Sequence, residues 1–292
     1  MSRTPSRGIP LMLAAVAVFS IMDASMKQLT LAYPPLQVSC LRGLASIPFM
    51  LAAVAWRGDW RQLVPMRWAA HVVRGALAVG MLSLFVYSLK SLALTESYAI
   101  FLCAPLIVTA LSALLLHESV DRHRWLAIAV GLCGVMTMLR PSAAHLVSLG
   151  AAAALGSAVC YSLGVVMIRT LARTESTLSI ALSFMVAVAL ANGVAALPDW
   201  LPLQSRHWPW IATVGITGAL GQLLMIEAFR AAPASVITPF EYTALLFGLL
   251  LDWLLWRTLP DARTLLGGAV VTASGLYVIL REHRRLRAPA LH

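Results

Sequence analysis

Residues 68–90 read WAAHVVRGALAVGMLSLFVYSLK, an apolar run that ends in a lysine. A run of the same length, WPWIATVGITGALGQLLMIEAFR, covers residues 208–230 and ends in an arginine 140 positions after Lys90. Each run is long enough to cross the hydrocarbon core of a bilayer as an α-helix, because about 20 apolar residues suffice. The two runs therefore indicate membrane-spanning helices that occur in two copies.

A similar offset recurs along the chain. Lys27 and Arg169 end matching apolar runs 142 positions apart, and Gly134 precedes Gly275 by 141 positions. Five runs in each half predict ten spans, near residues 9–29, 36–56, 68–89, 97–116, 123–139, 148–168, 177–197, 208–229, 235–256 and 264–281. Because five is odd, the two halves must cross the membrane in opposite directions, as in transporters with one central site. The expected fold is an all-α integral membrane protein, with ten transmembrane helices in two inverted five-helix repeats around a central cavity.

The predicted domain boundaries follow these spans. The chain divides into a cytoplasmic N-terminal segment (1–8), a first five-helix repeat (9–140), an inter-repeat loop (141–147), a second repeat (148–281) and a basic cytoplasmic tail (282–292). The loop opens with Pro141, and proline disfavours helix in the residue before it. Little chain remains for a separate soluble domain.

The charge of the chain is explained by its expected topology. Of 292 residues, 60% are hydrophobic and 12% charged, with a formal net charge of +10. If the N-terminus is cytoplasmic, fourteen arginines lie on the inner side and six basic residues on the outer side. This distribution follows the positive-inside rule and places both termini in the cytoplasm of a bacterium, with the spans in its inner membrane. The expected partners are membrane lipid and a small-molecule substrate, with no nucleic acid; a monomer and a homodimer remain equally open.

Motifs for enzymatic chemistry are absent from the sequence. It contains no GxxxxGK[ST] loop for ATP hydrolysis and no HExxH or GxSxG motif. The seven histidines are scattered, and the four cysteines fall inside predicted spans, where they are expected to pack as small apolar residues. We therefore predict no enzymatic activity, no metal site and no cofactor.

Four charged residues lie deep within predicted spans: Asp23, Arg42, Arg74 and Glu241. Charge is costly there, so each is a functional hypothesis. Asp23 and Arg42 lie at matching depths near the outer face, and Arg74 and Glu241 near the inner face, each roughly 10 Å from the surface. Two interpretations stay open: the residues pair to hold helices together, or a carboxylate exchanges a proton as the cavity changes sides. Asp252 and Glu227 lie nearer span ends.

Four further basic residues end the first and third spans of each half, where they could attract anions at the mouths of a cavity: Lys27, Lys90, Arg169 and Arg230. For Lys27, the alternative is that its charge reaches the outer interface along the helix.

Several segments resemble the drug/metabolite transporter superfamily, and specifically its ten-helix EamA-type exporters. The first span of each half ends in a basic residue, in DASMKQL (23–29) and VVMIRTL (165–171). The third spans lead into YSLKSLALTESYAIFLCAPL (87–106) and EAFRAAPASVITPFEYTALLFGLLL (227–251). The acidic ending of the fourth span, in LLLHES (114–119), is displaced in its counterpart LLWRTLPD (254–261), to which no role is carried over. Within the superfamily the chain is most similar to the amino-acid exporters, including those for aromatic amino acids.

The resemblance implies a cavity lined by the first, third and fourth spans of each half. Candidate cavity residues on these spans are Ser20, Tyr87, Tyr98, Tyr161, Ser162, Gln222, Glu241 and Tyr242. The expected function is export of amino acids, with aromatic and other apolar ones favoured, and of related small metabolites, by alternating access. The alternatives are a broad exporter of small molecules or cationic drugs in the same superfamily, and a membrane scaffold that transports nothing.

Overall fold

A computed structural model describes residues 8–57, 60, 67–115, 122–139, 148–171, 174–231, 237–258 and 260–287. Every regular element in these ranges is helical. The predicted inter-repeat loop 141–147, most of the N-terminal segment and the end of the basic tail lie outside the described residues.

The described part of the first half contains six α-helices: α1 (Gly8–Thr30), α2 (Pro35–Arg57), α3 (Trp68–Ser91), α4 (Leu94–Phe101), α5 (Ala104–Leu115) and α6 (Arg122–Leu139). The second half contains the long helices α7 (Leu149–Leu171), α8 (Thr177–Ala196), α9 (Trp208–Ala231) and α12 (Ala262–Arg287). Between α9 and α12 lie the 3₁₀ turn η5 (Thr238–Tyr242), α11 (Thr243–Leu251) and the π-helical turn η6 (Asp252–Trp256). Two short turns, η3 (Leu197–Asp199) and η4 (Ser205–His207), connect α8 to α9.

Six of the described helices are long and apolar enough to cross a membrane: α1, α2, α3, α7, α8 and α9. The expected continuous fourth span is wrong in detail, because residues 94–115 divide into α4 and α5 at a turn over Leu102 and Cys103. Pro105, in the first turn of α5, has no backbone N–H to donate to the preceding turn, which accounts for the break. The ninth span is helical over residues 238–256 but changes helix type along its length, from η5 through α11 to η6.

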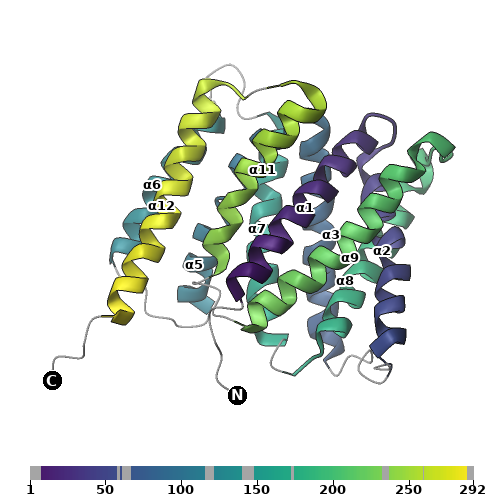
Figure 1. The fold of residues 1–292 in the computed structure, drawn as a ribbon, viewed down its shortest axis with the longest axis horizontal. Coiled ribbons are helices and arrows are strands. Elements are labelled where there is room, and N and C mark those ends of the chain that lie inside the picture. Colours follow the sequence, from purple (N-terminus) through teal and green to yellow (C-terminus); the bar gives the residue numbers. More distant parts are fainter. Residues whose placement is uncertain are drawn as a thin grey trace.

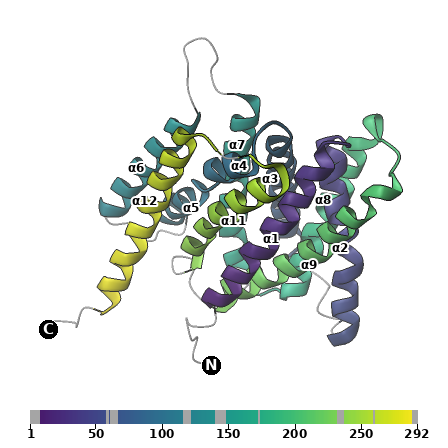
Figure 2. The same cartoon turned by 45° about the horizontal axis from the view of Figure 1, so that its top comes forward.

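The long helices pack across the two halves of the chain. α1 lies against α9, α3 against α7, α2 against α8, and α6 against α12. Figures 1 and 2 show α6 and α12 side by side at one end of the long axis, with α2 and α8 toward the other end. The halves are therefore interleaved into one bundle rather than folded as separate units.

Two glycines set the close approach of α2 to its neighbours. A Cβ on Gly43 would lie 2.7 Å from the backbone nitrogen of Ala189 in α8, and one on Gly215 in α9 would overlap the carbonyl of Ala45. Only a hydrogen fits at such contacts, and small residues allow this approach between membrane helices. α2 is thereby held closely between α8 and α9.

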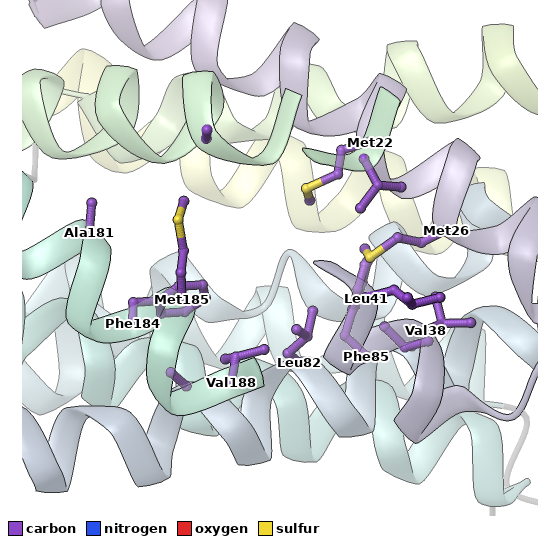
Figure 3. Packing of buried hydrophobic residues seen from close by; sticks show 14 of the residues in the cluster. Met22, Met26, Val38, Leu41, Leu82, Phe85, Ala181, Phe184, Met185 and Val188 are labelled. Carbon is purple, nitrogen blue, oxygen red and sulfur yellow. The ribbon is translucent and has the colours of Figure 1, made fainter. Parts of the chain in front are cut away.

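A cluster of buried side chains fills the space between α1, α2, α3 and α8 (Figure 3). Its members include Met22, Met26, Val38, Leu41, Leu82, Phe85, Phe184, Met185 and Val188. Within a lipid environment such contacts stabilise mainly through close packing, because lipid tails are as apolar as the side chains. The cluster fixes four helices relative to one another beside the cavity described next.

Candidate functional site

A cavity of about 150 Å³ lies where the two halves meet. Its described lining comes from α1, α3, α4, α7, α9 and the η5–α11 segment, the six spans implied by the resemblance. Two further residues enter from outside this set, Arg42 from α2 and Phe184 from α8. Most of the wall is apolar, and four methionines contribute to it: Met12, Met22, Met81 and Met225. Methionine side chains adapt their shape readily, so such walls can accommodate ligands of more than one shape.

Each cavity carboxylate accepts a hydrogen bond from a tyrosine. The Tyr98 hydroxyl donates to Oδ2 of Asp23 over 2.8 Å, joining α4 to α1. The Tyr161 hydroxyl donates to Oε1 of Glu241 over 3.0 Å, joining α7 to η5. These acid–phenol contacts therefore link the first span of each half to the fourth span of the same half.

A row of aromatic rings connects the two acid–phenol contacts. Phe85 stacks on Tyr98 with ring centres 6.1 Å apart, and lies edge-on to Phe101 at 5.3 Å. Phe101 in turn lies 5.2 Å from Tyr161. These distances fall in the range preferred by interacting aromatic pairs. The row gives the cavity an aromatic wall with a polar contact at each end.

Two arginines share a different wall. The Arg42 guanidinium lies 5.2 Å from the centre of the Phe184 ring and 5.8 Å from that of Phe19. The Arg74 guanidinium lies 5.5 Å from the same Phe184 ring, and its Nη1 donates to the carbonyl of Ile180 over 2.8 Å. Aromatic faces and a backbone carbonyl thus position both cations.

The expected ion pairs are replaced by these contacts. Among the described residues, Arg74 and Glu241 form no direct ion pair, because Tyr161 bonds the carboxylate and Ile180 accepts from the guanidinium. Asp23 and Arg42 face the same cavity and interact electrostatically, without a direct hydrogen bond. All four charges are therefore buried around one cavity, but each is held mainly by uncharged groups.

The other candidate residues divide into two groups. Ser20 and Gln222 line the cavity with Tyr98, Tyr161 and Glu241. Three do not belong to its described lining: Tyr87, whose side chain is 41% exposed; Ser162, which donates to the carbonyls of Ala104 and Ala158; and Tyr242, which is buried beside the cavity. Tyr87 is therefore corrected to an outward-facing residue, and Ser162 to a packing contact between α7 and α5.

Asp252 has a role that the sequence did not reveal. Its carboxylate accepts from the backbone nitrogens of Leu94 (3.2 Å) and Thr95 (2.7 Å) and from the Thr95 hydroxyl (2.7 Å). It therefore caps the N-terminus of α4 from the π-helical turn η6. The signal available in the sequence was Ala93, which precedes α4 and has no side-chain acceptor with which to cap it.

Lys27 strengthens the same end of the bundle. Its Nζ donates to the carbonyl of Leu92 over 2.6 Å and lies 5.2 Å from the centre of the Trp256 ring. Where these contacts lie relative to the membrane interface, the alternative interpretation for Lys27, stays a prediction. It ties the end of α1 to the α3–α4 turn and to η6. Lys90 is exposed, and the side chain of Arg169 lies outside the described part of the chain.

A second set of contacts joins the helices at the opposite end of the bundle, where α3 begins and α9 ends (Figure 1). Oε1 of Glu175 accepts from the backbone nitrogen of Arg67 over 2.9 Å and lies 3.7 Å from Nε2 of His71. The Thr177 hydroxyl donates to Glu227 over 2.7 Å, and Arg230 donates to the carbonyl of Glu175. Polar contacts therefore hold the helices together at both ends of the cavity.

The family assignment rests on a match to both halves. The model of the EamA-like transporter family matches residues 6–140 and again residues 148–281. The chain belongs to this family. It is a multi-pass membrane protein of a bacterial transporter family, and transport of a small molecule fits the cavity between its two halves.

Relatives of this EamA-like protein are similar over nearly their full length. An uncharacterised transporter of Helicobacter pylori is 30% identical over 96% of this chain and 97% of its own. A riboflavin transporter of Vibrio cholerae is 26% identical (97% and 96%), and a pseudopaline exporter of Pseudomonas aeruginosa is 26% identical (91% and 94%). A crystal structure at 21% identity matches 98% of this chain and 100% of its own with a TM-score of 0.72, which shows a shared fold.

Proposed function

We propose that this EamA-like protein is a secondary transporter that moves small amphiphilic metabolites through its cavity by alternating access. The observation that carries the proposal is the pair of acid–phenol contacts. Asp23–Tyr98 joins the first and fourth spans of the first half, and Glu241–Tyr161 joins the corresponding spans of the second half. The two contacts line the same cavity. A transporter built from two related halves needs such paired contacts, because each half must exchange one conformation for the other.

Helix packing supports two inverted five-helix repeats within 9–140 and 148–281. Exchange of corresponding spans turns the α1–α9 contact into the α7–α3 contact, which is also present, and leaves the α2–α8 and α6–α12 contacts unchanged. α1 and α7 begin at opposite ends of the bundle, whereas α1 begins and α12 ends at the same end (Figures 1 and 2). The arginine-rich side would then be cytoplasmic, with both termini on it.

The contacts at the two ends provide the elements that would open alternately. Lys27 and Asp252 hold one end, and Glu175 with Arg230 holds the other. Opening toward one side requires that one set break while the other persists. In the conformation described here both sets of contacts are formed.

Amino acids with aromatic or other apolar side chains are the proposed substrates, and export is the proposed direction. The aromatic row suits an apolar body, and the few polar side chains suit the polar groups of an amino acid. The relatives that carry riboflavin and pseudopaline support a second candidate, a broader exporter of small metabolites, and the methionine-rich wall favours it. A cavity of about 150 Å³ is smaller than the ~300 Å³ typical of ligand pockets, so a ligand as large as riboflavin would require the cavity to widen.

Uptake into proteoliposomes tests this proposal. The purified protein would be offered amino acids, riboflavin, a sugar and a cationic drug, with and without an imposed pH gradient. Saturable flux of at least one of them is expected. Transport of none would favour the scaffold interpretation, and flux that does not saturate would favour a channel.

A further inference from the structure

Arg42 is a buried cation whose hydrogen-bonding groups face the cavity unused. Its side chain lines the cavity, although only 7% of the residue is exposed. The phenyl rings of Phe19 and Phe184 lie against it, but among the described residues none accepts a hydrogen bond from its guanidinium. A guanidinium has five N–H donors, and because Arg42 lines the cavity its donors can bind an acceptor there. The guanidinium of Arg42 can therefore donate hydrogen bonds to a ligand in the cavity.

Arg74 adds a second cation to the same wall. Its guanidinium lies against the same Phe184 ring as that of Arg42, and only one of its donors is used, by the carbonyl of Ile180. Two guanidinium groups against one ring in a mostly apolar cavity favour a bound anion there, since a low dielectric strengthens interactions between charges.

The two cavity carboxylates do not serve as that anion. Asp23 is bonded to Tyr98 and Glu241 to Tyr161, and neither forms a direct ion pair with an arginine. Arg42 of α2 and Arg74 of α3 lie against Phe184 of α8, while the carboxylates bond tyrosines of α4 and α7. Asp23 interacts electrostatically with Arg42 without a direct hydrogen bond, so the guanidinium donors can still bind a negatively charged group.

We infer that the cavity selects substrates that carry a carboxylate, with Arg42 and Arg74 binding the carboxylate and the aromatic row holding an apolar body. The inference rests on the proposed transport function and narrows its substrate class. Arginine suits the task because its planar donors can engage both carboxylate oxygens while it stacks on a ring. An amino acid meets the requirement, and a cation that lacks an anionic group does not.

Three probes that share one phenyl ring test the inference: phenylpyruvate (an anion), L-phenylalanine (a zwitterion) and phenethylamine (a cation). Their binding would be measured by the shift in melting temperature of the purified protein, since a ligand that binds the folded state stabilises it. Uptake of each would be measured in proteoliposomes. Phenylpyruvate and L-phenylalanine, which carry a carboxylate, are expected to raise the melting temperature, and phenethylamine is expected to leave it unchanged. Failure of phenylpyruvate to bind at millimolar concentration would overturn the inference.

Variants separate the anchor from other effects. Arg42→Gln is expected to weaken phenylpyruvate binding by tenfold or more, the usual consequence of losing a hydrogen bond to a charged group. Arg42→Lys keeps the charge but loses the planar donors, so its affinity for phenylpyruvate should lie between those of the parent and of Arg42→Gln. Arg206→Gln, at an exposed arginine of η4, is the matched control and should bind as the parent does. Arg74→Gln provides a second test if the Arg42 variants elute as aggregates.

A double variant distinguishes a ligand anchor from a partner for Asp23. If Arg42 only neutralises Asp23, then Asp23→Asn combined with Arg42→Gln should restore phenylpyruvate binding, and that result would refute the inference. Saturable transport of phenethylamine as fast as phenylalanine would also refute it, while leaving the transport function intact. Binding of phenylpyruvate without transport of any probe would instead count against the transport function alone.

Discussion

Asp252→Asn is expected to loosen the closure of the cavity at the end held by Lys27 and η6. The carboxylate of Asp252 accepts three hydrogen bonds from the start of α4, and an amide of the same size can replace at most two of them. A hydrogen bond to a charged group contributes about 1.5–3 kcal/mol, so the substitution should weaken the closed state by about 2 kcal/mol. Since 1.4 kcal/mol is a factor of ten, the population open at this end should rise by about 30-fold.

Cys160 offers a direct measurement of that population, because it lines the cavity. In a variant with Cys40, Cys103 and Cys133 changed to alanine, a membrane-impermeant maleimide added on the Asp252 side should react faster with the partly exposed Cys160 the more often this end opens. The labelling rate of Cys160 should therefore rise by about 30-fold on Asp252→Asn.

A matched control and the opposite face complete the test. Asp199→Asn, at an exposed aspartate of η3, should leave the labelling rate within about twofold of the parent. An unchanged rate in a folded Asp252→Asn variant would refute the assignment of Asp252 to closure. An equal increase from the opposite membrane face would refute it as well, because it would report general loosening of the bundle.

Three further predictions concern single positions. Glu241→Gln keeps an acceptor for Tyr161 but cannot exchange a proton, so proteoliposome uptake should persist and lose its dependence on a pH gradient; retention of that dependence would exclude Glu241 as the coupling group. Gly215→Ala should lower the free energy of unfolding of the purified protein by about 1–3 kcal/mol, because its Cβ would overlap the α2 backbone. Gly164→Ala is the control and should leave the melting temperature unchanged, because the space around Gly164 is open. Equal melting temperatures of the two variants would contradict the prediction. Tyr87→Phe should leave uptake within about twofold of the parent, since its side chain faces outward, and a tenfold loss would return it to the cavity.

Periodicity and duplication carried the prediction of the helices and of the cavity a long way. The runs around Lys90 and Arg230 predicted α3 and α9 almost to their ends. Because burying charge in a membrane is costly, Asp23 and Glu241 were predicted to be functional residues, and both line the cavity. These predictions succeed because the lipid around the bundle requires an apolar sequence of each helix separately, so the sequence of one helix is enough to identify it.

Contacts between helices were beyond the sequence because they depend on rotation and approach. Each residue turns a helix by about 100°, so a small error in rotation exchanges a cavity residue for an outward one. Tyr87 and Phe85 illustrate this: both lie on α3, yet Phe85 lines the cavity and Tyr87 does not. The same reason explains why Arg74 was paired with Glu241 at equal depth, whereas Tyr161 reaches that carboxylate first.

The relation between the two halves is clearer in their contacts than in their residues. Glu241 has no acidic counterpart at the matching position of the first half, and by sequence it is an asymmetry. In the structure, its bond to Tyr161 corresponds to the bond between Asp23 and Tyr98, with the acid and the phenol exchanged between the first and fourth spans.

Exchange of the acid and the phenol conserves the contact but not its surroundings. Asp23 interacts electrostatically with Arg42, whereas Tyr161 is the side chain that bonds Glu241. An anion bound at Arg42 would therefore change the charge felt at Asp23 far more than at Glu241. The two halves, which contain equivalent acid–phenol bonds, would then respond unequally to the same substrate.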